Sequence, residues 1–458
     1  MKVYAVLIIA VMMMVGTTSS FAQSTLRLDD FLRQVELNNP ALRSADFEPE
    51  LAEAEVRSAL GRFDPVLNMS YEYKDKDGKD KLNLFDGSLE LPLDMLFGPK
   101  LKASYSRGIG SSINPESGTT TPGEGALGIS MPILQGIFTD SRRNQLRKAM
   151  LRPDLAQAQY RLERNNLLRT AGMRYWDWSE ALAAVEVADT MLALAVRRLN
   201  FVARRAQAGE SAVIDSVEIA QEVERRKGER FRALRIEEQL RVDVAVFLWN
   251  GNGTPQQTIG TRPLDLPPIA DTTVQAIDAA NLARATRPEL RRAEVFQQTS
   301  RLDSSLAQEF MRPYIEVEAA LLAYDVTSLS NTDYKLGFRI NQPLLFRQAS
   351  AQQQTAGITV QRADLTRSLI ERMVDADAVN AVIAIDRSRE RLEASNEEVR
   401  LARFMVDAEQ RKFVAGESTL LQLNLRERFL AEALLRQVSA RADWARARLM
   451  LRWATGTI

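Results

Sequence analysis

The chain of 458 residues contains no cysteine and no histidine. It therefore has no disulfide framework, no thiol nucleophile, no histidine-based catalytic triad and no zinc-finger spacing. A metal ion could bind only through carboxylate and carbonyl oxygens, and we expect neither a metal site nor a cofactor. An excess of charge is also lacking, because 60 Lys and Arg residues balance 60 Asp and Glu residues. Nucleic acid, which selects basic surfaces, is therefore not an expected partner.

Long hydrophobic runs are missing as well, except at the N-terminus. Lys2 is followed by Val3–Val15, a run of 13 residues without a charge, and then by small and polar residues. Ser20 and Ala22 fit the small-x-small cleavage pattern, which predicts a signal peptide over residues 1–22 and a mature chain starting at Gln23. An N-terminal membrane anchor is the alternative, but it needs about 20 apolar residues. A chain of this sequence would have to cross a membrane through β-strands.

Five landmarks of the first half recur in the second half in the same order. They are Pro40 and Pro288, Pro65 and Pro313, Pro132 and Pro343, Gly209–Ser211 and Gly416–Ser418, and Trp249 and Trp453. The offset falls from 248 to 211 between the second and third landmarks, so the first half carries 37 additional residues there. This pattern predicts two copies of one unit, a first repeat over residues 23–250 and a second over 272–458, joined by a linker over 251–271.

Apolar and polar residues alternate with period two in several segments, which predicts β-strands. Four segments occur in matching places of the two halves: Leu67–Tyr73, Leu127–Ile133, Ile315–Leu321 and Tyr334–Ile340. The additional 37 residues contain two more, Leu89–Leu93 and Leu101–Tyr105, on either side of a turn near Leu96–Pro99. A soluble sheet would alternate in the same way. Full charges at the polar positions and lengths near ~10 residues favour membrane strands.

In a membrane barrel the polar strand positions face a water-filled lumen, because a charge facing lipid at the midplane costs ~2 to 4 kcal/mol. The expected lumen-facing residues are Glu72, Lys102, Glu316, Glu318 and Arg339. The expected lipid-facing residues are Tyr71, Leu101, Val317 and Phe338. Six strands are too few for a single-chain barrel, so subunits would have to share one. The connections Lys74–Lys81 and Gly110–Glu124 are expected outside, and the Leu96–Pro99 turn on the periplasmic side.

Two stretches almost free of Gly and Pro, Thr139–Ala208 and Gln348–Ala415, predict long helices. Apolar residues from Leu168 to Ala206 follow steps of three and four, close to the coiled-coil period of 3.5. A second helix follows each Gly-Glu-Ser, so each Gly-Glu-Ser is predicted to be the tip of an antiparallel hairpin. Gly209 and Gly416 are expected as C-caps with positive φ, and Ser211 and Ser418 as N-caps. The tips serve either as turns alone or also as a contact surface.

This order of signal peptide, helix, strands, long helix, Gly tip and return helix, used twice, resembles the TolC-like outer-membrane factor family. The motifs that carry the resemblance are Asn39–Leu42, Gln342–Leu345 and Val414–Leu423. It implies an α+β membrane protein: a homotrimeric outer-membrane β-barrel continued by an α-helical coiled-coil barrel in the periplasm of a Gram-negative-type bacterium. With six strands per chain the barrel would have eighteen strands instead of the twelve of the family.

The resemblance also implies a function and partners. It implies a passive export duct of a tripartite efflux or type I secretion system, with a periplasmic adaptor (membrane fusion) protein, an inner-membrane pump and outer-membrane lipid as partners. Such a duct is not an enzyme and needs no cofactor. The implied docking and aperture residues at the tips are Gly209, Glu210, Ser211, Asp215, Gly416, Glu417, Ser418, Thr419 and Gln422.

The aperture departs from the family pattern. In well-known members two aspartates lie six and nine residues after the second-tip glycine, and a Tyr and an Arg hold the aperture closed. Those positions here are Gln422, Leu425, Phe413 and Ser418, whereas Asp215 in the first tip does match. The acidic ring is therefore absent, and we expect other contacts to hold the closed state.

Two other functions have to be weighed against a duct. Gly123–Gly128 fits the GxGxxG pattern of a dinucleotide-binding enzyme, but that fingerprint needs a strand before it and a helix after it. Here a loop precedes it and an alternating segment follows. A periplasmic coiled-coil scaffold without a channel would share the long helices but would have no use for six alternating segments.

Overall fold

The computed structural model describes residues 24–110, 118–209, 212–256, 261–263, 266–267, 274–324 and 332–458. The predicted signal peptide lies outside the described residues. The chain folds into two compact units, which we call unit 1 (residues 1–43, 163–286 and 375–458) and unit 2 (44–162 and 287–374). Each unit combines residues from both predicted repeats. The origin of the two halves from one ancestral unit stays a prediction.

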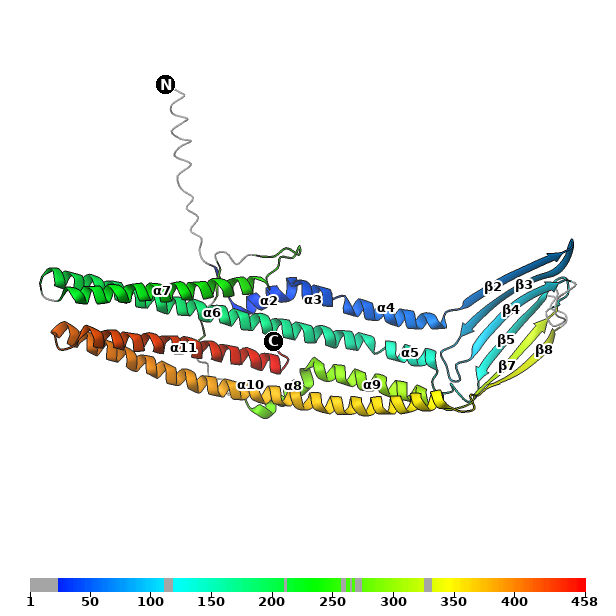
Figure 1. Cartoon of the computed structure of the whole chain (residues 1–458). Helices are drawn as coiled ribbons and strands as arrows, with labels where there is room; N and C mark the ends of the chain where they lie inside the picture. Colours follow the sequence, from blue (N-terminus) through cyan, green and yellow to red (C-terminus); the bar gives the residue numbers. More distant parts are fainter. Residues whose placement is uncertain are drawn as a thin grey trace, which may run out of the picture. The chain divides into compact units, whose positions relative to one another are not determined.

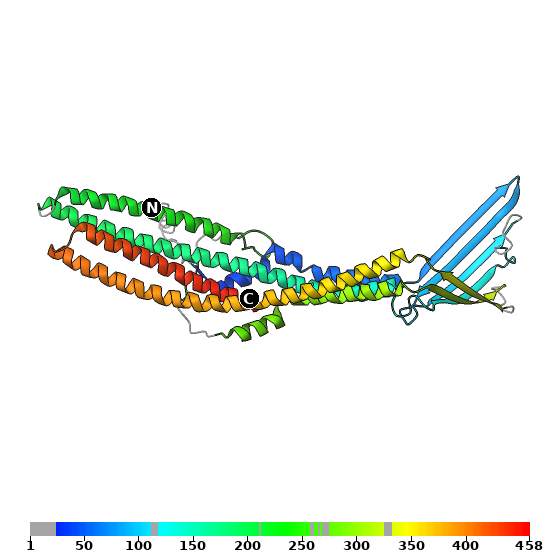
Figure 2. The same cartoon turned by 60° about the horizontal axis from the view of Figure 1, so that its bottom comes forward.

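Two antiparallel helical hairpins dominate unit 1. The first joins α6 (Arg152–Gln207) to α7 (Val213–Ala245), and the second joins α10 (Arg347–Ala415) to α11 (Leu420–Ala454). Figures 1 and 2 both show α6 beside α7 and α10 beside α11. The predicted long helices and return helices are thereby confirmed. No helix in the described part of the chain combines the length and the apolar character needed to cross a membrane.

Shorter elements complete unit 1. They are β1 (Ser24–Leu26), α2 (Leu28–Asn38), β6 (Thr261–Pro263) and α8 (Ala276–Thr286), with α3 (Pro40–Ala45) next along the chain after α2. β1 and β6 form a parallel pair. Because β6 lies within the predicted linker, and Leu266 joins the hydrophobic core, this segment is packed structure as well as a connection.

The core of unit 1 gathers large side chains from both hairpins. Trp178, Tyr175 and Trp444 are almost fully buried, and the Trp178 Nε1–H donates to Glu237 Oε1 at 2.9 Å. Gly172 lies inside the continuous helix α6. A Cβ at this position would approach Leu449 Cδ2 to 2.6 Å, so the glycine permits close packing of α6 on α11.

Unit 2 contains the sheet and short helices. The helices are α4 (Glu48–Leu60), the 3-10 turn η1 (Gly61–Phe63), α5 (Ser141–Ala149) and α9 (Pro288–Glu309). Asp140 caps α5 by accepting from the backbone N–H groups of Arg142 and Arg143. The helix predicted from Thr139 is interrupted after Ala149, just before Pro153, as expected of proline.

Six antiparallel strands form one sheet in the order β2-β3-β4-β5-β7-β8 (Figure 1). They are β2 (Val66–Lys76), β3 (Lys79–Pro92), β4 (Lys100–Ile109), β5 (Glu124–Pro132), β7 (Tyr314–Ala323) and β8 (Thr332–Asn341). All six predicted strands are present. The prediction that the additional residues of the first half form a hairpin, β3–β4, is confirmed.

The connection predicted over Lys74–Lys81 is wrong. β2 continues to Lys76 and β3 starts at Lys79, so only two residues turn the chain. Asp77 and Gly78 have φ of 58° and 70°, the positive values that a tight type I′ hairpin turn requires. Of the other expected connection, Gly110–Glu124, residues 111–117 lie outside the described residues.

The turn between β3 and β4 is fixed to the start of α5. Arg143, which is 4% exposed, donates to the carbonyl oxygens of Met95 at 3.1 Å and Ile137 at 3.2 Å and to that of Gly136. Its Nε–H also donates to Asp140 Oδ2 at 2.8 Å. A buried guanidinium with these partners holds the turn at the helix end of the sheet, opposite the Asp77–Gly78 turn.

Candidate functional site: sheet faces and hairpin tips

The strand register divides the sheet into one polar face and one largely apolar face. Residues opposite each other on neighbouring strands share a face, and alternate residues along a strand change face. Glu316 lies opposite Arg339, and Lys102 lies opposite Glu90. Tracing the register across all six strands brings every residue expected in the lumen onto one face: Glu72, Lys102, Glu316, Glu318 and Arg339.

Acidic and basic groups are mixed on this polar face. Lys100 Nζ lies 2.9 Å from Glu90 Oε1, and Arg339 Nη1 lies 3.3 Å from Glu316 Oε2. The register adds further charged residues to the face: Glu72, Lys74, Asp86, Lys102, Glu124, Glu318, Asp333 and Lys335. The face therefore carries closely spaced charges of both signs.

The opposite face is largely apolar, with Asn83 and Arg107 among its exceptions, and it holds the four residues expected to face lipid, Tyr71, Leu101, Val317 and Phe338. Its side chains are strongly exposed toward the two outer strands, for example 63% for both Tyr71 and Phe338. A broad apolar surface of this kind needs a hydrophobic environment or partner.

The second hairpin tip ends α10 with a Schellman motif. Gly416 has φ of 82°, its N–H donates to the Phe413 carbonyl at 3.2 Å, and the Glu417 N–H donates to the Lys412 carbonyl at 2.9 Å. This is the bond pair that an αL glycine supports after a helix. The predicted C-cap role of Gly416 is confirmed, and Glu417 lies exposed beside it.

The N-cap of α11 is Thr419 and not Ser418, so that prediction is wrong. Thr419 Oγ1 accepts from the Gln422 N–H at 3.3 Å. Ser418 instead donates to Glu409 Oε1 at 2.5 Å. Both hydroxyl residues can cap a helix, and the nearby carboxylate on α10 decides between them.

The first tip has the same glycine geometry. Gly209 has φ of 78° and its N–H donates to the Ala206 carbonyl at 3.1 Å, as predicted. Glu210 and Ser211, with the N-cap role predicted for Ser211, lie outside the described residues, and Ala212 at the start of α7 has no side-chain cap. Asp215 is half-buried in the first turn of α7, where the helix dipole favours a negative charge.

Apolar side chains are exposed at both tips. Val213, Ile214 and Leu421 are 72%, 69% and 69% exposed, beside the exposed polar residues Thr419 and Gln422. Deeper in the unit, Leu420 and Phe413 of the second tip pack with Val202 and Ile219 of the first hairpin. The two tips of one chain therefore pack against each other through apolar side chains and also expose apolar side chains on their surface.

Two buried carboxylates near the tips were not predicted. Glu409 on α10 and Glu427 on α11 are each 7% exposed. Both occupy positions where the heptad steps of their helices otherwise bury apolar residues, such as Leu423 and Leu430 around Glu427. An acidic residue in an apolar stripe is the sequence signal that could have identified them.

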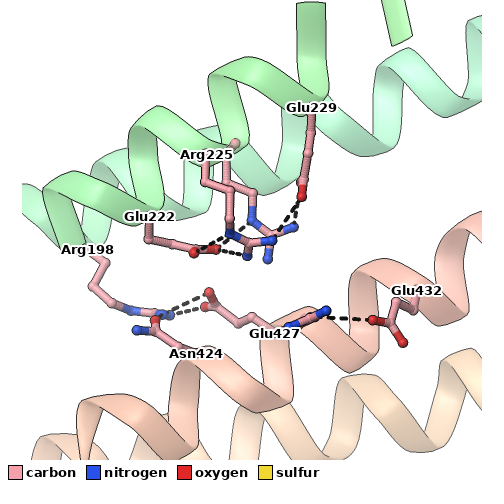
Figure 3. A network of polar contacts seen from close by, with 9 residues as sticks. Arg198, Glu222, Arg225, Glu229, Asn424, Glu427 and Glu432 are labelled. Carbon is pink, nitrogen blue, oxygen red and sulfur yellow. Dashed lines mark hydrogen bonds and ion pairs between the residues drawn. The ribbon is translucent and has the colours of Figure 1, made fainter. Parts of the chain in front are cut away.

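Glu427 forms a buried ion pair between the two hairpins (Figure 3). Arg198 on α6 donates from Nη1 to Glu427 Oε2 at 2.8 Å and to Asn424 Oδ1 at 3.0 Å, and from Nη2 to Glu427 Oε1. Burial lowers the pKa of the Arg198 guanidinium to about 10; Glu222 opposes this shift and Arg226 adds to it. Arg198 remains charged at neutral pH and links α6 to α11.

A second cluster of charges lies on α7 beside this pair (Figure 3). Glu222 accepts from Arg225 Nε at 2.8 Å and from Arg226 Nε at 2.8 Å, and Glu229 accepts from both arginines. Burial raises the pKa of Glu222, but the hydrogen bond from Arg225 and the charges of both arginines hold it below its ordinary value. A groove of about 360 Å³ with alanine walls and an arginine rim borders the cluster.

These sites offer surfaces and fixed charges. No group of three potential ligands for a metal ion occurs in the described ranges. Residues 124–128 of the GxGxxG pattern lie within strand β5, whereas a dinucleotide fingerprint leads into a helix.

No family model and no curated protein matches the sequence. Solved structures do match. The outer-membrane channel OprN is similar with a TM-score of 0.70 and 15% identity over 94% of this chain and 90% of that chain. The outer membrane protein VceC from Vibrio cholerae has a TM-score of 0.66 and 14% identity over 94% and 96%. The open state of the MtrE outer membrane channel from Neisseria gonorrhoeae has 0.66 and 16% over 94% and 89%. The chain thus has the fold of the TolC-like outer-membrane channels, as its sequence predicted.

Proposed function

We propose that the protein is a passive export channel of the outer membrane with a large periplasmic part. The observation that carries the proposal is the six-stranded sheet, which has one charged face, one exposed apolar face and two free edges among the described residues. Such a sheet suits a bilayer only as part of a closed barrel, because an open edge leaves backbone groups without partners in lipid. Similarity in fold to outer-membrane channels supports the same function.

The barrel is shared by three copies of the chain. Six strands are fewer than the eight of the smallest single-chain barrels, so one chain cannot enclose a lumen. In a trimer the sheets form an eighteen-stranded barrel, with Glu72, Lys102, Glu316, Glu318 and Arg339 facing water. The helical hairpins continue the duct into the periplasm.

The hairpin tips dock a periplasmic adaptor that connects the duct to an inner-membrane pump, in a tripartite efflux or type I secretion system. Exposed apolar residues at the tips, such as Ile214 and Leu421, support this docking role. Exposed apolar side chains that lie close together are typical of protein-binding surfaces. The glycine-based turn gives the second tip a defined backbone. The closed state relies on the internal packing of the tips, since Gln422 replaces an acidic aperture residue.

Cysteine labelling tests the barrel directly, because the chain contains no native cysteine. In outer membranes, Lys102→Cys should react with a membrane-impermeant maleimide that enters the water-filled lumen. Leu101→Cys on the same strand should be protected by lipid. The pair Glu318→Cys and Val317→Cys provides an independent repeat on β7. Equal labelling of neighbouring positions would contradict the barrel. Failure to find a heat-sensitive trimer in outer membranes would instead favour a periplasmic coiled-coil scaffold.

A further inference from the structure

β2 and β8 form the two edges of the sheet, and neither has a partner on its outer side within the described ranges. The strands are 11 and 10 residues long. Since the six strands alternate in direction, β2 and β8 run antiparallel to each other. A β8 edge can therefore accept β2 of a second copy and continue the antiparallel order. This step rests on the proposed trimeric barrel and concerns how its copies meet.

The register inside one chain limits how two copies can pair. One lateral line of paired residues runs across the sheet through Val66, Glu90, Lys102, Gly128, Ala320 and Lys335. It starts at the first residue of β2 and leaves the sheet at Lys335. On reaching the next copy, this line meets the β2 residue that lies opposite Lys335. The number of residues between Val66 and that residue is the register shift that each subunit adds to the barrel.

Continuity of the faces allows only steps of two residues. The polar face continues across the junction if Lys335 lies opposite a residue of β2 on the same face. Val66, Asn68 and Lys76 would give tilts of about 0°, 13° and 50°, outside the range of membrane strands. Ser70, Glu72 and Lys74 would shift the sheet by four, six and eight residues from Val66. With strands about 4.8 Å apart and about 3.4 Å per residue, eighteen strands would then tilt by about 25°, 35° or 43°. Membrane strands tilt by about 35 to 45°, which excludes Ser70.

Charge separates the two remaining registers. With Lys74 opposite Lys335, two like charges would face each other, which destabilises a strand pair. With Glu72 opposite Lys335, the neighbouring pair on the same face is Lys74 opposite Asp333, so both pairs join opposite charges. These four side chains are exposed in the isolated chain and can meet a second copy without rearrangement.

We propose that β8 of one copy pairs with β2 of the next in the register that places Glu72 opposite Lys335 and Lys74 opposite Asp333. Three such junctions close an eighteen-stranded barrel. Without the β3–β4 hairpin the same chain would supply four strands, and three copies would supply twelve. Because barrel diameter grows roughly in proportion to strand number, the hairpin widens the barrel by about half. The barrel then admits cargo of larger cross-section than a twelve-stranded one.

Disulfide formation between copies tests this register on a cysteine-free background. The variants Glu72→Cys/Lys335→Cys and Tyr71→Cys/Leu336→Cys place cysteines at two successive opposed positions. One of two successive pairs in an antiparallel ladder is non-hydrogen-bonded and brings its side chains close enough for a disulfide. At least one variant should therefore give covalent trimers on non-reducing gels after mild oxidation of outer membranes.

Matched controls carry the same second cysteine in the rejected register: Lys74→Cys/Lys335→Cys and Tyr73→Cys/Leu336→Cys. They should remain monomeric on the same gels. Preferential linkage of these controls would overturn the register. Amine-reactive cross-linking of the unmodified chain tests the trimer independently of the β2–β8 register. If it shows trimers while no cysteine pair links, the β2–β8 junction is wrong and the duct stands; if it shows only monomers, the trimeric duct itself fails.

Discussion

Replacing Arg198 by methionine should strongly destabilise unit 1. The substitution removes the partner of Glu427, which is 7% exposed, and leaves a charge in the interior. Loss of one member of a buried ion pair costs about 3 to 5 kcal/mol. Arg198→Met/Glu427→Met removes both charges and should recover most of that loss, since apolar replacement of a whole buried pair is often neutral or stabilising.

An exposed pair in the same unit provides the control. Arg387 Nη1 lies 2.6 Å from Glu390 Oε2 on α10, but the two side chains are 74% and 55% exposed. Arg387→Met should therefore cost no more than about 1 kcal/mol. The two arginine substitutions change the same atoms, so the difference between them measures the effect of burial.

Tryptophan fluorescence during urea unfolding is a suitable assay, because all 5 tryptophans of the chain lie in unit 1. A loss from Arg198→Met no larger than that from Arg387→Met would refute the reasoning. So would a double variant as unstable as the single one.

Three further changes have defined outcomes. Gly416→Ala should destabilise the protein by about 1 to 2 kcal/mol, because φ at this position is positive although no atom lies within 4 Å of the added Cβ. The control Gly228→Ala, in a helix with the same open space, should stabilise it by about 0.5 to 1 kcal/mol. Equal effects of the two substitutions in urea unfolding would exclude the αL turn at Gly416. Glu222→Gln should cost about 1 to 2 kcal/mol at pH 7. The pKa of Glu222 is lowered below 4.5 in the folded state, so its contribution to the free energy of unfolding is present above pH 4.5 and is lost as the pH falls through the folded pKa. If wild type and Glu222→Gln differed by the same free energy of unfolding at pH 7 and pH 3, the ion pairs of Glu222 would be contradicted. Leu421→Arg should leave the Thr419 cap and the trimer intact yet abolish export, and normal export in cells would remove the tip from the docking surface.

The fold could be predicted where sequence periodicity matches burial. Leu67–Tyr73 and Tyr334–Ile340 alternate cleanly, and the stripe from Leu168 to Ala206 keeps its steps of three and four. The first half of β3 was missed because its alternation is inverted: Leu82 and Leu84 occupy the polar face. The Asp77–Gly78 dipeptide is the signal that would have corrected it.

The site could be predicted only where it depends on local geometry. Gly209 and Gly416 could be identified because a glycine directly after a predicted helix marks a helix end with positive φ. The choice between Ser418 and Thr419 as N-cap depends on Glu409, which lies on the preceding helix. The Arg198–Glu427 pair joins residues 229 positions apart, and no local pattern specifies such a contact.

The β3–β4 hairpin also bears on how proteins of this fold can change during evolution. A hairpin adds one strand in each direction, so its insertion leaves the directions of β2 and β8 and the attachment of the neighbouring helices unchanged. Its turn is held by Arg143 on α5, and within the described part of the chain its strands pair only with β2, β5 and each other. Gain or loss of such a unit can therefore alter the size of a sheet in one genetic event, whereas a single added strand would reverse an edge and send the following chain to the wrong end.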